Sequence, residues 1–218
     1  MVRQRVRIRF SKSGNLKYIG HKDLLRAFVL LFRRAGLPFA MSGGFHPKIK
    51  MSFPSALALG IEGFDEVLEL ELKESVDDSV LLADLNRQSI DGLKFLSARV
   101  LNEVERKGKL LSSIFELTVP EQFRLETKNR IAEFLSKETV IVNKSNVKNP
   151  AREVDVRDAV QSIKFQTETG LLQAEIISRE GRPEAGIREL LFVLNLDKEY
   201  FQTIFPKRIK CVLAGDDC

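Results

Sequence analysis

Residues 2–10 alternate between two kinds of side chain, and this alternation limits how the segment can fold. With Gln4 as the exception, one set of alternate positions is apolar: Val2, Val6, Ile8 and Phe10. The positions between them are all arginine: Arg3, Arg5, Arg7 and Arg9. A period of two residues is typical of a β-strand with one buried face. We therefore predict a strand whose second face carries four guanidinium groups.

Positive charge is concentrated near the start of the chain. Residues 1–50 hold twelve Lys and Arg side chains and a single acid, Asp23, whereas the whole chain has 35 basic and 30 acidic side chains. An asymmetry of this size steers polyanions toward the basic segment. The pattern favours an anionic partner, and RNA is the partner that we predict.

The order of the predicted elements indicates the fold class. Within residues 1–104 the elements are a strand at 2–10, a helix at 21–35, strands at 49–58 and 67–73, a helix that follows 77–79, and a strand at 93–101. This is the β-α-β-β-α-β order of a split βαβ, or ferredoxin-like, domain. After a charged linker the order recurs without visible sequence similarity, and its strands include a predicted hairpin between residues 154–166 and 171–179. We predict an α+β chain with two ferredoxin-like subdomains in tandem, residues 1–104 and 110–218.

Several function classes are disfavoured by composition. The two cysteines, Cys211 and Cys218, provide no disulfide framework, and together with two histidines they match no usual metal-ligand spacing. No apolar run approaches the roughly 20 residues that span a bilayer. We expect a cytoplasmic protein without a membrane partner, a metal site or a cofactor.

The arginine face is the first candidate site, because the planar guanidinium group is suited to phosphate. The alternative is structural. Glu69 and Glu71 point outward on the strand expected beside the first one, so cross-strand ion pairs could use two of the arginines. Two acids cannot neutralise four bases, and exposed pairs contribute only about 0.2–1 kcal/mol. We therefore predict RNA binding by Arg3, Arg5, Arg7 and Arg9.

Two neighbouring features extend this prediction. Lys22, Arg26 and Arg33, spaced by four and seven residues, share one side of the predicted helix. A solvated helix face is the alternative. The second feature is a glycine-rich loop with two lysines: Gly43, Gly44, Phe45, His46, Lys48 and Lys50. Paired glycines let backbone amides approach a phosphate, although a tight structural turn explains the same pattern.

The two histidines, His21 and His46, support an alternative function. With basic residues nearby they could cleave RNA by acid–base chemistry at the 2′-hydroxyl group, without a metal. The competing interpretation gives each a local role, His21 in the first turn of a helix and His46 in the turn before Pro47.

Several motifs together resemble those of the radical-SAM-linked protein family, a bacterial domain family of unknown function. They are Arg7-Ile8-Arg9-Phe10-Ser11-Lys12, residues 16–24 (LKYIGHKDL), residues 33–38 (RRAGLP), Gly44-Phe45-His46-Pro47, Met51-Ser52-Phe53, residues 56–60 (ALALG) and Asp65-Glu66. Ile49 and Pro54 depart from the family's pattern.

The resemblance implies that the partner is a radical SAM protein. This chain has no Cys-x3-Cys-x2-Cys motif, so it lacks the ligands for the iron–sulfur cluster of such enzymes. Together with the basic segment, this predicts a non-catalytic RNA-binding accessory protein that positions a substrate for that enzyme. The alternative to an RNA partner is protein docking, in which the basic segment meets an acidic surface of the radical SAM protein.

Overall fold

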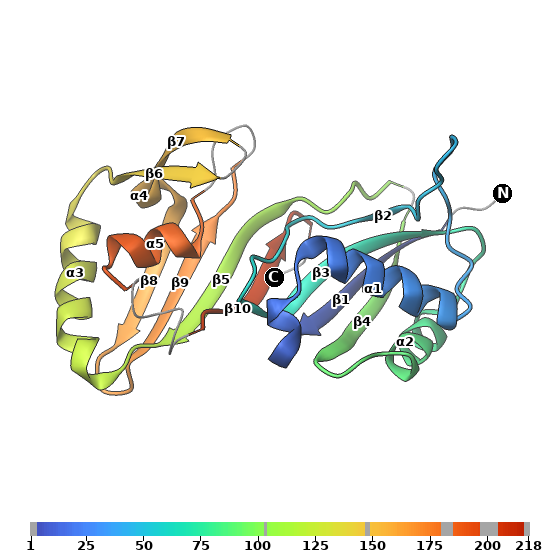
Figure 1. Ribbon diagram of the computed structural model, residues 1–218, viewed down its shortest axis with the longest axis horizontal. Helices are drawn as coiled ribbons and strands as arrows, with labels where there is room; N and C mark the ends of the chain where they lie inside the picture. The colour runs from blue at the N-terminus through green and yellow to red at the C-terminus, as the bar shows by residue number, and fades with distance from the viewer. Residues whose placement is uncertain (1–3, 103, 147–148, 180–184, 197–204, 216–218) are drawn as a thin grey trace. The chain divides into compact units, whose positions relative to one another are not determined.

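The computed structural model describes residues 4–102, 104–146, 149–179, 185–196 and 205–215 (Figure 1). Contacts divide these residues into two compact units. Unit 1 comprises the described residues up to Leu110 and those from Leu213 on, and unit 2 comprises those between Leu111 and Val212. Both units combine strands with helices, which confirms the predicted α+β class. None of the described helices is long and apolar enough to cross a membrane.

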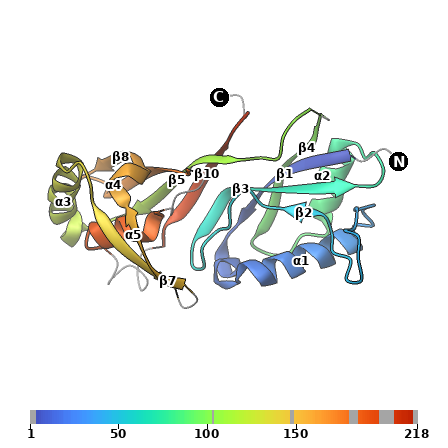
Figure 2. The same ribbon diagram turned by 90° about the horizontal axis from the view of Figure 1, so that it is seen from above.

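In unit 1, an α-helix follows the first and the third strand of an antiparallel sheet (Figure 2). Its elements are β1 (Gln4–Lys12), a 3-10 helix (Gly14–Tyr18), α1 (His21–Arg34), β2 (Met51–Ser52), β3 (Glu62–Leu72), α2 (Asp78–Arg87) and β4 (Leu93–Leu101). The strand β1 lies between β3 and β4, and β2 pairs with β3 on the far side from β1. The order of strands in this sheet is therefore β4-β1-β3-β2.

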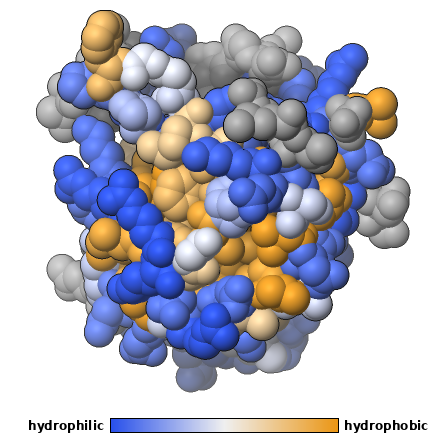
Figure 3. Space-filling view, turned by 90° about the vertical axis from the view of Figure 1, so that its right-hand side faces the viewer, coloured by the Kyte–Doolittle hydropathy of each residue, from blue (hydrophilic) through white to orange (hydrophobic). Residues whose placement is uncertain are grey.

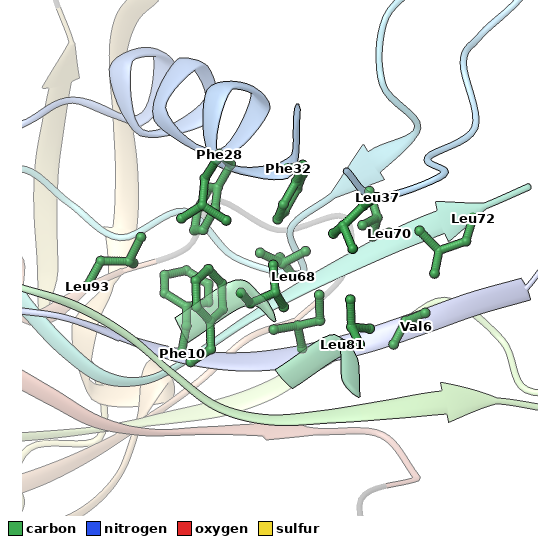
Figure 4. Packing of buried hydrophobic residues seen from close by; sticks show 14 of the residues in the cluster. Val6, Phe10, Phe28, Phe32, Leu37, Leu68, Leu70, Leu72, Leu81 and Leu93 are labelled. Carbon is green, nitrogen blue, oxygen red and sulfur yellow. The ribbon is translucent and has the colours of Figure 1, made fainter. Parts of the chain in front are cut away.

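The two helices pack on one face of this sheet. On β1, the apolar side chains that alternate with the arginines are Val6, Ile8 and Phe10, and they are at most 1% exposed. They join α1 and α2 in a single hydrophobic core (Figure 4). At its centre the rings of Phe10 and Phe28 meet edge to face with their centroids 5.1 Å apart. The predicted alternation of β1 is thus confirmed on its apolar side.

The predicted strand at 49–58 is the main difference within unit 1. Only Met51 and Ser52 pair with β3, and Pro54 follows, which has no amide hydrogen to donate to a neighbouring strand. Strand β3, by contrast, begins five residues before the predicted start at 67. These additional residues of β3 pair with β1 as far as Gly63, which lies opposite Lys12. The register of the two strands shifts between Phe10 and Lys12.

Unit 2 contains a four-stranded sheet and a separate hairpin. Its elements are β5 (Leu110–Thr118), a 3-10 helix (Glu121–Phe123), α3 (Arg124–Ser136), β6 (Ile141–Asn146), β7 (Asn149–Asp155), α4 (Val156–Ala159), β8 (Val160–Gln166), β9 (Leu171–Ile177), α5 (Ile187–Val193) and β10 (Lys207–Leu213). The sheet order is β10-β5-β9-β8, and β6 pairs with β7 alone.

The hairpin predicted between residues 154–166 and 171–179 is confirmed over β8 and β9, but its first strand begins at Val160, because Asp155 starts a short helix. The carboxylate of Asp155 accepts hydrogen bonds from the amides of Arg157 (3.0 Å) and Asp158 (3.4 Å) and so begins the short helix α4. Residues before this cap pair with β6, and residues after α4 pair with β9. The sequence pattern combined two strands that a helix cap separates.

Candidate nucleic-acid interface

Arg7 lies in a buried ion pair. Its Nε and Nη2 atoms donate to Oε1 of Glu69 at 3.1 and 3.0 Å, and the two side chains are 6% and 5% exposed. The backbone amide of Gly108 donates to the same carboxylate oxygen at 2.8 Å. A guanidinium group held in this way is not available to a phosphate in solution.

The other described arginines of β1 also have protein partners. Arg9 pairs with Asp65, and these side chains are 23% and 19% exposed. Arg5, half-buried, donates to the backbone carbonyl of Glu105. Arg3 lies outside the described residues. The prediction of an open cationic ridge is therefore wrong for Arg7 and Arg9, because β3 supplies a carboxylate to each.

The alternative weighed for the arginine face is confirmed in part. Glu69 does form a cross-strand pair with Arg7, which lies opposite it in the β1–β3 register. Glu71 lies opposite Arg5, yet its carboxylate accepts a hydrogen bond from Nζ of Lys50 at 3.0 Å. Lys50, a predicted phosphate ligand, is therefore already part of a half-exposed ion pair.

The outer face of α1 has the exposed cations that β1 lacks. Lys22, Arg26 and Arg33 are all exposed, and Leu30 lies among them with 57% of its surface accessible. Arg26 pairs with Asp23 at 3.0 Å, but these side chains are 79% and 60% exposed, and such a pair is weak. Among the described residues, neither Lys22 nor Arg33 has an ion-pair partner. These two cations are therefore available.

Residues 41–49 form a closed loop that projects from unit 1 (Figure 1). Met41 and Ile49 form an antiparallel bridge, and the amide of Ser42 donates to the carbonyl of Lys48 at 2.8 Å. In return the amide of Lys48 donates to Oγ of Ser42 at 2.9 Å. The tip between these bonds contains Gly43, Gly44, Phe45 and His46, all exposed. Gly44 has a φ of 99°, which favours glycine.

Phe45 at this tip is fully exposed, with a relative accessibility of 101%. Phe45 was part of the predicted loop site, but that prediction rested on the glycines and lysines of the loop and not on an exposed aromatic ring. The signal was its position, because a side chain between two glycines and His46-Pro47 has no strand or helix to direct it inward. Lys48, three residues later, is exposed as well, so an aromatic face and a cation share one loop.

Exposed apolar side chains interrupt the hydrophilic surface of unit 1. Figure 3 shows unit 1 from the side that lies on the right in Figure 1, with apolar side chains in the middle and hydrophilic ones around them. Apolar side chains such as Leu30 on α1 and Val80 on α2 are more than half exposed. This face of unit 1 therefore has separate hydrophilic and apolar areas.

The two histidines do not share a site. His21 is the first residue of α1, half-buried, and its ring meets that of Phe53 edge to face with centroids 5.2 Å apart. His46 is exposed in the loop that follows the C-terminal end of α1. The helix has 14 residues and is therefore about 20 Å long. The local role weighed for His21 agrees with this packing.

Lys12 and Glu66 form a buried charged cluster that sequence reasoning missed. Lys12 is 1% exposed and donates from Nζ to the carbonyl of Ile19 at 3.0 Å. Burial lowers the pKa of Lys12, and the nearby charge of Glu66, itself 3% exposed, acts in the opposite direction. A Cβ atom on Gly63 would lie 2.4 Å from Oε1 of Glu66, so only glycine leaves room for this carboxylate.

A family model described as an uncharacterized protein conserved in bacteria, DUF2344, matches residues 5–188. The chain belongs to this family. The match includes β1, α1, the projecting loop and the cluster around Lys12. The description of DUF2344 names no radical SAM enzyme, so that part of the resemblance stays a prediction. No curated protein matches this DUF2344 chain.

Two solved structures are similar to this DUF2344 chain at low scores. One is the crystal structure of an unknown protein from Galdieria sulphuraria, with a TM-score of 0.31 and 9% identity over 98% of this chain and 99% of that one. The other is a putative glycine cleavage system transcriptional repressor, with a TM-score of 0.26 and 8% identity over 98% and 99%. At these scores neither likeness bears on function.

Proposed function

We propose that this chain is a non-catalytic RNA-binding accessory protein that binds RNA through the outer face of α1 and the loop at 42–48. The observation that carries the proposal is Phe45, whose ring is fully exposed on a glycine-rich loop that also presents Lys48. Base–aromatic stacking contributes about 1–3 kcal/mol per base in single-strand binding. Lys22 and Arg33 supply cations that no described carboxylate neutralises.

The α1 cations are tested by replacing Lys22 and Arg33 with glutamine in one variant. We expect binding of a short fluorescent single-stranded RNA to weaken about tenfold, because two phosphate contacts are lost. The slope of log K against log salt should become shallower by about 1.4, at about 0.7 for each contact. Fluorescence anisotropy over a salt series measures both quantities.

The matched control is Lys94→Gln with Arg106→Gln, which changes the net charge equally. Lys94 lies on β4 between the core residues Leu93 and Phe95 and points away from the helices, and Arg106 lies in the linker. Equal weakening by both double variants would show that RNA responds only to net charge, and the α1 site would be abandoned.

The loop is tested at Phe45 with two substitutions. The chain contains no tryptophan, so Phe45→Trp introduces a single fluorescent ring at the tip. We expect RNA to quench its emission and to bind this variant at least as tightly as the wild type. Phe45→Leu keeps an apolar side chain without a π face and should bind about tenfold more weakly. Unchanged emission together with unchanged affinity of the leucine variant would contradict stacking.

The remaining parts of the proposal are the fold family and the partner. Both sheets place the last strand of the unit beside the first one, in the orders β4-β1-β3-β2 and β10-β5-β9-β8. This correspondence supports two ferredoxin-like units in tandem, with β6, β7 and α4 as an insertion in the second unit. A radical SAM enzyme as the partner rests on the sequence motifs alone. In this proposal the chain holds RNA while that enzyme performs the chemistry.

A further inference from the structure

We propose that a pocket in unit 1, apart from the α1 face, binds a phosphate monoester of about mononucleotide size. The pocket has a volume of about 260 Å3. Its polar lining side chains come from three strands, the base of the loop and the linker: Arg5, Ser42, Lys50, Ser52, Glu69, Glu71 and Lys107. On β1 and β3 these side chains belong to the face that the helices do not cover. The inference does not rest on the proposed RNA surface.

The charges of the pocket do not cancel. The carboxylate of Glu69 is neutralised by its ion pair with Arg7, and the carboxylate of Glu71 by its ion pair with Lys50. Two cations remain for a ligand. Arg5 uses one guanidinium nitrogen on the carbonyl of Glu105 and keeps its other donors. Lys107 is exposed and has no ion-pair partner among the described residues.

The remaining groups fit a phosphate better than a carboxylate. A phosphate monoester carries about −1.5 to −2 charges near neutral pH and three terminal oxygens, which match two cations and neighbouring hydroxyl donors. Oγ of Ser42 accepts from the amide of Lys48, so its own proton remains available to donate. Glu71, 24% exposed, offers an acceptor for a hydroxyl group of the ligand. The volume lies below the usual range of about 300–1,000 Å3 and excludes a dinucleotide.

The test compares AMP, adenosine and inorganic phosphate as probes, by isothermal titration calorimetry on the full chain. We expect AMP to bind at least tenfold more tightly than adenosine, and inorganic phosphate to compete with AMP. Lys107→Ala should weaken AMP binding about tenfold by removing one charge-assisted hydrogen bond. Arg106→Ala, the neighbouring exposed cation that does not line the pocket, should leave AMP binding unchanged.

Two further arms identify the source of the phosphate and separate this site from α1. A short RNA with a 5′-phosphate should bind more tightly than its 5′-hydroxyl counterpart if the pocket takes a strand end, and equally if it takes a free mononucleotide. The Lys22→Gln, Arg33→Gln variant should bind AMP like the wild type, whatever its RNA affinity. Equal binding of AMP and adenosine, no binding of either, or equal losses at Lys107 and Arg106 would overturn the proposal.

Discussion

Replacing Glu69 with alanine is expected to lower the free energy of unfolding by about 3–5 kcal/mol, because the change leaves the guanidinium of Arg7 buried without a counter-charge. The same carboxylate also accepts from the amide of Gly108, which would lose its acceptor. Urea denaturation followed by circular dichroism measures the loss. The effect is large since both partners are at most 6% exposed.

The control for this prediction is Glu71→Ala, two residues along the same strand. Its pair with Lys50 is 24% to 30% exposed, and such a pair contributes at most about 1 kcal/mol. A combined Arg7→Met, Glu69→Leu variant should recover much of the stability, because two apolar side chains need no counter-charge. Similar losses at Glu69 and Glu71 would show that the Arg7 pair is not the buried interaction described above.

The burial of Arg7 decides which variants can test nucleic-acid binding. Changing Arg5 and Arg7 to glutamate is the test of the arginine face that the sequence alone suggests. With Arg7 buried against Glu69, the same change places a second carboxylate in the buried site and is expected to unfold unit 1. A loss of binding would then report on folding, so exposed positions such as Lys22 and Phe45 are the informative ones.

The spacing of hydrophobic residues along the sequence predicted the helices and strands that bury one face. The helix at His21–Arg34 and the strand at Leu93–Leu101 were found where hydrophobic spacing placed them. The pattern also told which way the arginines of β1 point. It could not tell what packs over them, because the acceptors come from residues far along the chain, such as Glu69 and the carbonyl of Glu105.

The same limit explains what was missed at the candidate sites. Periodicity carries no information about a loop, so the exposure of Phe45 was not predicted. The burial of Lys12 was missed because the predicted strand ended at residue 10, two residues before the end of β1. Lys12 ends the alternating segment on its apolar side, two residues after Phe10, and a lysine at such a position normally extends to solvent. Here its Nζ reaches the carbonyl of Ile19, an interaction that depends on how the chain returns from the 3-10 helix.

Replacing Lys12 with methionine is expected to lower the free energy of unfolding by about 1–3 kcal/mol near neutral pH, because the carbonyl of Ile19 loses its hydrogen-bond donor. The carboxylate of Glu66 would also lose its attraction to Lys12, but the cost of burying the lysine charge, which exceeds that attraction, would be lost with it. Lys94→Met, an exposed lysine of the same unit, should change stability by no more than about 0.5 kcal/mol. Adding Glu66→Gln to the Lys12 variant should cost less than the sum of the two single changes.

The pH dependence separates this effect from a simple loss of packing. Because burial lowers the pKa of Lys12 in the folded protein, the unfolded chain binds more protons at pH values between the lowered pKa and the ordinary value of about 10.4. Deprotonation of Lys12 in the folded protein therefore raises the free energy of unfolding of the wild type as pH rises through this window. The methionine variant lacks the gain, so the stability difference should widen as pH rises from neutral toward about 10 in parallel urea titrations. A difference that narrows over that range would mean that the fold favours the charged lysine, and the burial of Lys12 would not be its dominant electrostatic feature.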